Sequence, residues 1–167
     1  MGDYERDTRG CTMLDMDGGL ATAIRAEIER HELGGVEAAA LACGETHSKR
    51  VKRGGFFGTL LGGQPKVTDH GWLITPEWLF LAVRSDRARE ATVMAFRLRD
   101  LEALDFARSE MAALTADTGV ELTGAPLGSV DRVGMFAPLG EGPDGDHLKR
   151  VLFEAVRAAG GVAPTSG

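Results

Sequence analysis

The sequence lacks the features that would direct it to a membrane or out of the cell. It has no run of about 18 apolar residues, the length that a helix needs to cross a bilayer. Its first ten residues, MGDYERDTRG, are polar and acidic, unlike the basic and apolar pattern of a secretory signal. We therefore expect a cytoplasmic protein.

Cysteine is also scarce. Only Cys11 and Cys43 occur among the 167 residues. The cytoplasm favours a reduced pair, and the sequence leaves a disulfide open as the alternative. No CxxC motif, HExxH motif or cluster of Cys and His is present, so neither a zinc site nor another cofactor is expected.

Catalytic motifs are missing as well. The sequence contains no nucleophile elbow and no GxxxxGK[ST] phosphate-binding loop. His47 precedes Ser48, but neighbours in sequence do not form a catalytic dyad without the right geometry. We therefore expect a protein that is not an enzyme, and a pocket containing His47 or His70 is the weaker alternative.

The charge of the chain is unevenly distributed. The formal net charge is −6, yet residues 49–66 hold five basic and no acidic residues, whereas the stretches on either side are both acidic. An acidic protein with one basic island is not expected to bind nucleic acid broadly. It can still present a local basic patch to an anionic partner.

The basic residues lie in or beside segment 48–63, SKRVKRGGFFGTLLGG, which is also rich in Gly and Phe. Each basic residue near an anionic leaflet gains about 1 kcal/mol, and an inserted Phe or Leu would add to this. The sequence therefore predicts contact with an anionic surface through these residues: Lys49, Arg50, Lys52, Arg53, Phe56, Phe57 and Lys66.

The same segment has other interpretations. Phe56, Phe57 and the leucines that follow them could lie in the core or in a contact between copies of the chain, because most apolar clusters are buried. The basic residues could instead bind an acidic protein or a nucleotide. The sequence leaves these alternatives open.

Hydrophobic periodicity predicts one helix near each end of the chain. Residues 1–16 have no clear period and are interpreted as a flexible tail. Residues 17–35 carry apolar side chains at helical spacing, with Asp17 as the N-cap. Near the C-terminus, Leu148, Leu152 and Val156 mark an amphipathic helix, which we expect Asp146 to cap. Residues 161–167 are interpreted as a second tail.

The residues between the helices read mostly as strands. Residues 36–45 are interpreted as a short strand, and 46–53 as a second strand after a turn at Gly44 and Glu45. Alternating or β-branched stretches follow at spacings near ten residues. These are KVTDHGWLIT, EWLFLAVRS, TVMAFRL, LEALDFA, GVELTG and DRVGMFAPL. Regularly spaced strands of this kind indicate a sandwich or a barrel.

Three of these stretches carry a resemblance to a known family. The paired strands of bacterial PH-like and GRAM-type domains resemble the stretch GWLITPEWLFLAV. The next strand pair of those domains resembles FRLRDLEALDF, and their C-terminal helix resembles DHLKRVLFEAVRAAG. The resemblance covers residues 36–160. It implies an α+β, mostly β fold: a small antiparallel PH-like barrel or sandwich with a C-terminal capping helix and an extra N-terminal helix.

The resemblance also implies a role for the basic residues. In eukaryotic relatives, the loop of the first hairpin commonly holds lipid phosphates through basic side chains, and Lys49, Arg50, Lys52, Arg53 and Lys66 occupy the corresponding region. We therefore expect a non-enzymatic binding or adaptor module that contacts membrane lipid, at the inner face of the membrane, or an acidic protein partner. The alternative is a self-associating protein that uses residues 54–63 and the N-terminal helix as contact surfaces.

Overall fold

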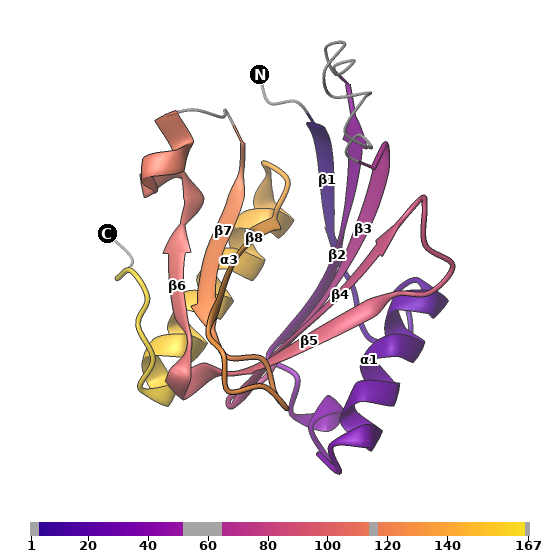
Figure 1. The fold of residues 1–167 in the computed structure, drawn as a ribbon, viewed down its shortest axis with the longest axis vertical. Coiled ribbons are helices and arrows are strands. Elements are labelled where there is room, and N and C mark those ends of the chain that lie inside the picture. The colour runs from indigo at the N-terminus through magenta and orange to yellow at the C-terminus, as the bar shows by residue number, and fades with distance from the viewer. Residues whose placement is uncertain (1–3, 52–64, 114–116, 166–167) are drawn as a thin grey trace.

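The strands of this chain form two antiparallel sheets that face each other, with one helix on the outer side of the larger sheet and another along the side of the pair (Figure 1). The computed structural model describes residues 4–51, 65–113 and 117–165. Its main elements are β1 (Tyr4–Gly10), α1 (Gly18–Arg30), β2 (Ala42–Arg50), β3 (Val67–Ile74), β4 (Trp78–Ser85), β5 (Thr92–Arg97), β6 (Glu102–Asp105), β7 (Gly119–Gly124), β8 (Val133–Pro138) and α3 (Pro143–Ala159).

Each sheet joins strands that follow one another in the sequence. The larger sheet has the order β1-β2-β3-β4-β5 and the smaller sheet the order β6-β7-β8. The short 3-10 turn Leu98–Asp100 leads the chain from β5 into β6. In Figure 1 the two sheets meet at this lower corner and diverge upwards. The fold is therefore α+β and mostly β, as predicted, but the described strands form two open sheets and not a closed barrel.

The central strands of the larger sheet are buried on both faces. Along β4, Leu79 and Leu81 point into the core between the two sheets, and Phe80 points into a second core on the outer face. Successive side chains of a strand lie on opposite faces. A strand that is covered on both sides therefore reads as continuously apolar, as the sequence Trp78–Ala82 does.

Helix α1 covers the outer face. The carboxylate of Asp17 accepts hydrogen bonds from the backbone N–H groups of Gly19 and Leu20, so Asp17 is the N-cap that the sequence predicts. Leu20 and Ile24 are fully buried in the outer core. The predicted helix within residues 17–35 is confirmed, since α1 spans Gly18–Arg30.

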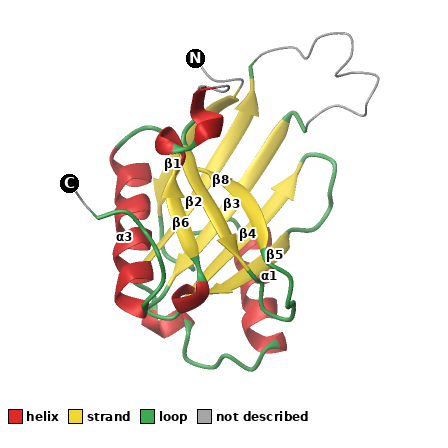
Figure 2. Cartoon of the chain, turned by 60° about the vertical axis from the view of Figure 1, so that its left-hand side comes forward, coloured by secondary structure: helices red, strands yellow, loops and turns green. Residues whose placement is uncertain are grey.

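Helix α3 closes the side of the two sheets. It lies along one flank of the molecule in Figure 2 and buries Leu148, Leu152 and Val156, the predicted stripe. The prediction that Asp146 caps this helix is wrong. The N-cap is Gly142, and Pro143 occupies the first turn, where its missing N–H costs no hydrogen bond.

Both predicted tails contain paired backbone, so those predictions were incomplete. Tyr4–Gly10 form β1, which pairs with β2 along its whole length. Its inward side chains Arg6 and Thr8 are polar, so the sequence shows no apolar alternation that would indicate a strand here. Near the other end, Val162 exchanges backbone hydrogen bonds with Leu101 and Ala103 beside β6.

The region 36–53 also differs from the expectation. Glu37–Ala39 form a 3-10 turn, and a single strand, β2, runs from Ala42 to Arg50. The predicted turn at Gly44 and Glu45 is wrong. Gly44 instead provides room for α3, because a Cβ atom at this position would lie 2.4 Å from Cδ1 of Leu148.

An ion pair on the inner face links β1 to the smaller sheet. Nε and Nη2 of Arg6 each donate to one carboxylate oxygen of Asp117, both at 2.7 Å, and Nη1 donates to Oγ of Ser48. The guanidinium also lies 5.3 Å from the ring centroid of Phe136. Side-chain exposure is only 8% for Arg6 and 19% for Asp117, so this bidentate pair is largely shielded from water.

We predict that Asp117→Ala destabilises the fold strongly, because it leaves the Arg6 guanidinium buried without its partner. The expected loss is roughly 3 kcal/mol of unfolding free energy, measured by urea denaturation. Glu154→Ala is the control, since Glu154 pairs with Arg150 in water at 3.6 Å and both side chains are half exposed. That change is expected to cost less than about 0.5 kcal/mol. Equal losses in the two variants would contradict the prediction.

A buried histidine makes stability depend on pH. His70 is 6% exposed on the inner face of β3, and its Nδ1 has no hydrogen-bond partner among the described residues. Burial, with a smaller contribution from the charge of Arg6, lowers the pKa of His70 to about 4 from the ordinary 6.5. The unfolded chain therefore takes up this proton first as the pH falls, and the folded state loses stability.

We predict that stability falls by about 3 kcal/mol between pH 6.5 and pH 4 through His70 alone. His70→Gln should remove this part of the pH dependence, measured as the difference between the wild-type and variant unfolding free energies across that range. His147→Gln, which changes an exposed histidine in α3, is the control and should keep the pH dependence that His70 causes. A His70→Gln profile parallel to that of the wild type would show that His70 is not the group that titrates.

Candidate functional site

Three of the predicted binding residues, Lys49, Arg50 and Lys66, lie together where β2 ends and β3 begins. The backbone N–H of Arg50 donates to the carbonyl of Lys66 at 2.8 Å, and Lys49 is paired with Val67 across the sheet. Lys49 and Lys66 are exposed. Arg50 is half-buried, and its Nε is enclosed without a hydrogen-bond partner in the described structure. The antiparallel register therefore brings residues 16 positions apart to one place.

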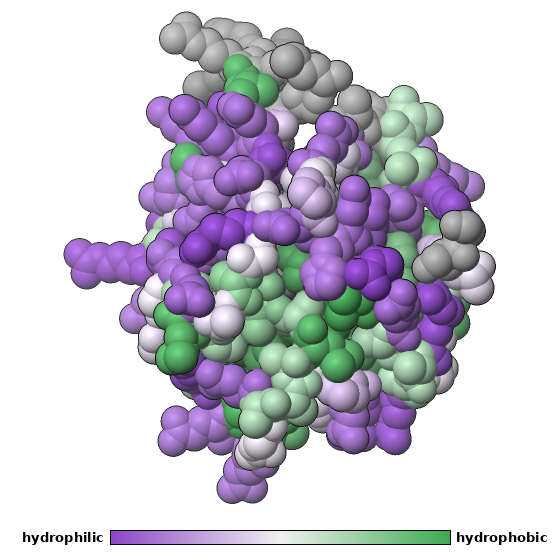
Figure 3. All heavy atoms as spheres, turned by 180° about the vertical axis from the view of Figure 1, so that it is seen from behind, coloured by the Kyte–Doolittle hydropathy of each residue, from purple (hydrophilic) through white to green (hydrophobic). Residues whose placement is uncertain are grey.

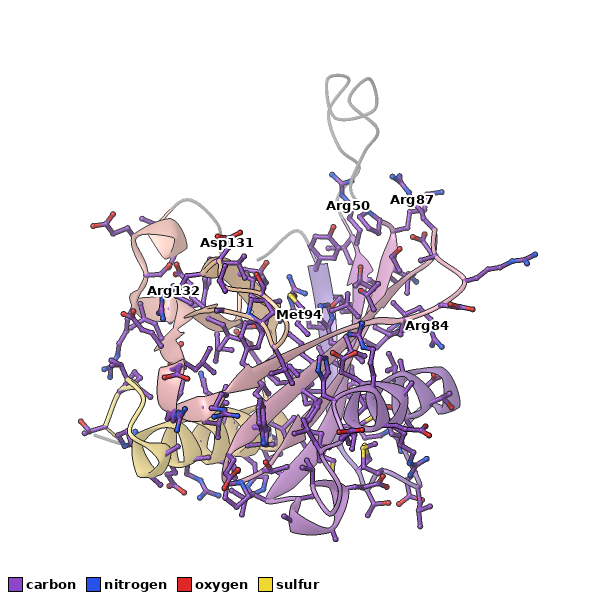
Figure 4. All side chains as sticks on the ribbon, turned by 60° about the horizontal axis from the view of Figure 1, so that its bottom comes forward. Arg50, Arg84, Arg87, Met94, Asp131 and Arg132 are labelled. Atoms are coloured by element: carbon purple, nitrogen blue, oxygen red, sulfur yellow. The ribbon has the colours of Figure 1, made fainter. Side chains whose placement is uncertain are left out.

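The neighbouring hairpin adds basic residues that the sequence analysis missed. The backbone N–H of Asp86 donates to the carbonyl of Val67 at 3.0 Å, so the β4–β5 turn lies beside the start of β3. This turn carries Arg87 and Arg89, both exposed. Figure 4 shows Arg50 and Arg87 at the same end of the larger sheet. The run DRARE, which follows the predicted strand EWLFLAVRS, is the feature of the sequence that could have indicated these residues.

We call this region the basic hairpin end and define it by Lys49, Arg50, Lys66, Arg87 and Arg89. Acidic residues are present there too, because Asp86 and Glu90 lie on the same turn and Glu5 is paired with Lys49. Positive charges remain in excess. In the space-filling view from behind, hydrophilic side chains are more frequent in the upper half of the molecule than in its centre (Figure 3).

The remaining predicted binding residues, Lys52, Arg53, Phe56 and Phe57, lie outside the described residues. The whole of the predicted contact segment 54–63 also lies outside the described residues. Their assignment to an anionic surface therefore stays a prediction. By sequence, Lys52 and Arg53 follow Arg50 after one residue, Val51, so they continue the basic run.

A groove borders the basic hairpin end. It lies between α1 and the β4–β5 hairpin and has a volume of about 740 Å³. Gly19, Ala23 and Ala26 are the small residues of the helix that line it, and Arg84 and Arg89 line it from the hairpin with cationic side chains. A Cβ atom on Gly19 would lie 2.5 Å from Nη1 of Arg84, so a larger residue here would displace the end of that side chain.

A network of charged side chains holds Arg84 at the edge of this groove. Arg84 donates to Asp17 at 2.8 Å and to Asp69 at 3.1 Å. The hydrogen bond from Arg84 lowers the pKa of Asp17. On the other side of Asp69, its Oδ1 lies 2.6 Å from Nδ1 of His47. Because Arg84 pairs with two carboxylates of the fold, its positive charge is largely neutralised there.

The pair of His47 and Asp69 has the geometry in which a carboxylate orients an imidazole. Such an imidazole can act as a general base through its other nitrogen, provided that a nucleophile or an activated water lies within reach. The hollow beside His47 is lined by Leu20, Thr46 and charged side chains, and the hydroxyl of Thr46 is buried against Thr8. Among the described residues, no serine, cysteine or lysine lines this hollow.

Other kinds of site find no support in the described parts of the chain. Within residues 4–51, 65–113 and 117–165, no group of three or more His, Cys, Asp or Glu side chains could hold a metal ion. None of the helices in those ranges is long and apolar enough to cross a bilayer. Comparison of the chain with known protein families, curated proteins and solved structures finds no match.

Proposed function

We propose that this chain is a non-enzymatic binding module of PH-like organisation that contacts an anionic membrane surface through the basic hairpin end. The observation that carries the proposal is the convergence of two adjacent hairpins, which bring Lys49, Arg50 and Lys66 next to Arg87 and Arg89. An excess of cations on neighbouring turns suits a flat anionic surface, because several side chains can reach it at once.

The order of the elements supports the PH-like part of the proposal. Residues 36–160 contain two antiparallel meanders followed by one amphipathic helix, α3, which packs between the sheets' edges. β1 and α1 are additions to that plan, and both lie on the larger sheet. They leave the basic hairpin end uncovered, since Lys49, Lys66 and Arg89 are exposed.

Electrostatics predicts that this contact is reversible and sensitive to salt. Each basic residue near an anionic surface contributes about 1 kcal/mol, and that attraction is screened within roughly 10 Å at 0.1 M salt. Lys49, Lys66 and Arg89 have exposed side chains and are outside the core. Their replacement should therefore weaken binding without unfolding the chain.

We predict that the chain co-sediments with vesicles of phosphatidylcholine and phosphatidylserine, but not with phosphatidylcholine alone, and that added salt releases it. The triple variant Lys49→Gln, Lys66→Gln, Arg89→Gln should bind these vesicles about 100-fold more weakly, which corresponds to about 3 kcal/mol. The readout is the vesicle concentration that binds half of the protein, at two salt concentrations.

The matched control removes three exposed arginines elsewhere. The control is the triple variant Arg99→Gln, Arg108→Gln, Arg150→Gln. It changes the net charge by the same amount, but all three residues lie outside the basic hairpin end. This control should keep most of the affinity. Equal weakening in both triple variants would show attraction by net charge alone, and binding that does not depend on phosphatidylserine would overturn the proposal.

Self-association is the second candidate function, and one observation favours it. Leu14 and Leu41 are 88% and 50% exposed and line the same hollow, beside Met13 and Ala42. Exposed apolar side chains that lie together are typical of contact surfaces. The apolar stripe of α1, by contrast, is already buried against the larger sheet, so the helix offers less to a second copy than the sequence suggested.

For a chain that self-associates, we predict that the double variant Leu14→Ser, Leu41→Ser shifts the equilibrium between oligomer and monomer toward the monomer. Sedimentation velocity over a range of protein concentrations measures this shift. Leu104→Ser, which changes an exposed leucine on β6, is the control and should leave the equilibrium unchanged. A wild-type chain that is monomeric at every concentration would exclude this candidate.

A further inference from the structure

The two cysteines of the chain are direct neighbours across the β1–β2 pair. Gly10, the last residue of β1, is paired with Gly44, so the next residues in register are Cys11 and Cys43. The backbone N–H of Cys11 donates to the carbonyl of Cys43 at 3.2 Å. Two residues that are 32 positions apart in the sequence are thus held opposite each other.

Both thiols lie on the same side of the sheet. Cys11 and Cys43 pack against the outer core formed with α1, next to the buried Met13 and Met16. They also line one hollow of about 370 Å³. Each cysteine is half-buried and carries a free thiol, so a small reagent can approach the pair from this hollow.

The Cα spacing of such a pair is compatible with a disulfide, provided that the end of β1 shifts enough to bring the two Cβ atoms to about 3.5–4.5 Å. Hydrogen-bonded residues that face each other in an antiparallel pair have Cα atoms about 5.5 Å apart, within the range of roughly 4.4–6.8 Å that a disulfide spans. β1 is an edge strand that pairs with β2, so its end can adjust. We propose that Cys11 and Cys43 form a dithiol site that is oxidised to an intramolecular disulfide by low-molecular-weight disulfides such as oxidised glutathione.

The reaction proceeds by two exchange steps. The thiolate of one cysteine attacks a sulfur of the glutathione disulfide, which forms a mixed disulfide and releases one glutathione thiolate. The second cysteine then loses its proton and attacks the protein sulfur of the mixed disulfide, which releases a second glutathione. The two protein sulfurs lose two electrons in total, and one glutathione disulfide is reduced to two glutathione molecules.

The environment of the thiols sets the pH dependence of this reaction. Burial raises the pKa of Cys11 to about 11 and also raises the pKa of Cys43. Glu45 adds to the shift at Cys11, whereas Arg9 opposes it; Glu37 faces Cys43. Since the thiolate is the nucleophile, oxidation should be faster at alkaline than at neutral pH. The disulfide would join the ends of segment 11–43, which contains α1.

The test is to incubate the reduced, full-length, folded chain with excess oxidised glutathione and then to denature it. The expected result is a fall from two free thiols to none, a mass lower by two hydrogens, and a cross-linked peptide that contains Cys11 and Cys43. The product should remain monomeric on non-reducing gels and unfold at a higher temperature than the reduced chain.

The matched control moves one thiol to the other face of the same strand. The double variant Ala42→Cys, Cys43→Ala retains two cysteines. Position 42, however, packs against the core between the sheets and not against the outer core. It should form no internal bridge in the folded state. Two glutathione adducts on the wild-type chain, an absence of reaction in the folded state, or equal bridging in the control would each overturn the proposal. None of these readouts depends on vesicle binding.

Discussion

The fold depends on the need to cover both faces of β3 and β4. These two strands are buried along most of their length, and their side chains divide between an inner core and an outer core. Burial of apolar area contributes roughly 25 cal/mol per Å², so leaving either face in water would be costly. The smaller sheet and α3 cover one face, and α1 covers the other.

This constraint explains why β1 and α1 belong to the folded unit. α1 supplies the second cover for Phe80 and Leu73, and β1 extends the larger sheet toward α3. The inner side chains of β1 are polar, so the strand is held by specific bonds more than by apolar contact. Arg6 meets Asp117 across the gap between the sheets, and Thr8 accepts a hydrogen bond from the backbone of Gly140.

The same sheet also separates the regions that could have a function. Its hairpin turns lie beyond the apolar part of the strands, so charged side chains gather there at no cost in buried charge. The basic hairpin end lies at these turns, whereas Cys11 and Cys43 lie at the opposite end of β2, where β1 gives way to the chain leading to α1. A membrane contact and a thiol exchange site would therefore occupy different ends of one strand.

The sequence by itself determined the elements with a strong period. α1, α3 and the strands from β3 to β8 follow from apolar spacing and turn residues, because these local patterns need no knowledge of partners. The sequence also identified the basic run at Lys49 and Arg50. Only the tertiary structure decided which residues lie together: the turn of Asp86 and Arg87 beside the start of β3, Asp117 on Arg6, and Cys11 opposite Cys43. Such pairings depend on strand register and sheet packing, which relate residues far apart in the chain and leave no local trace.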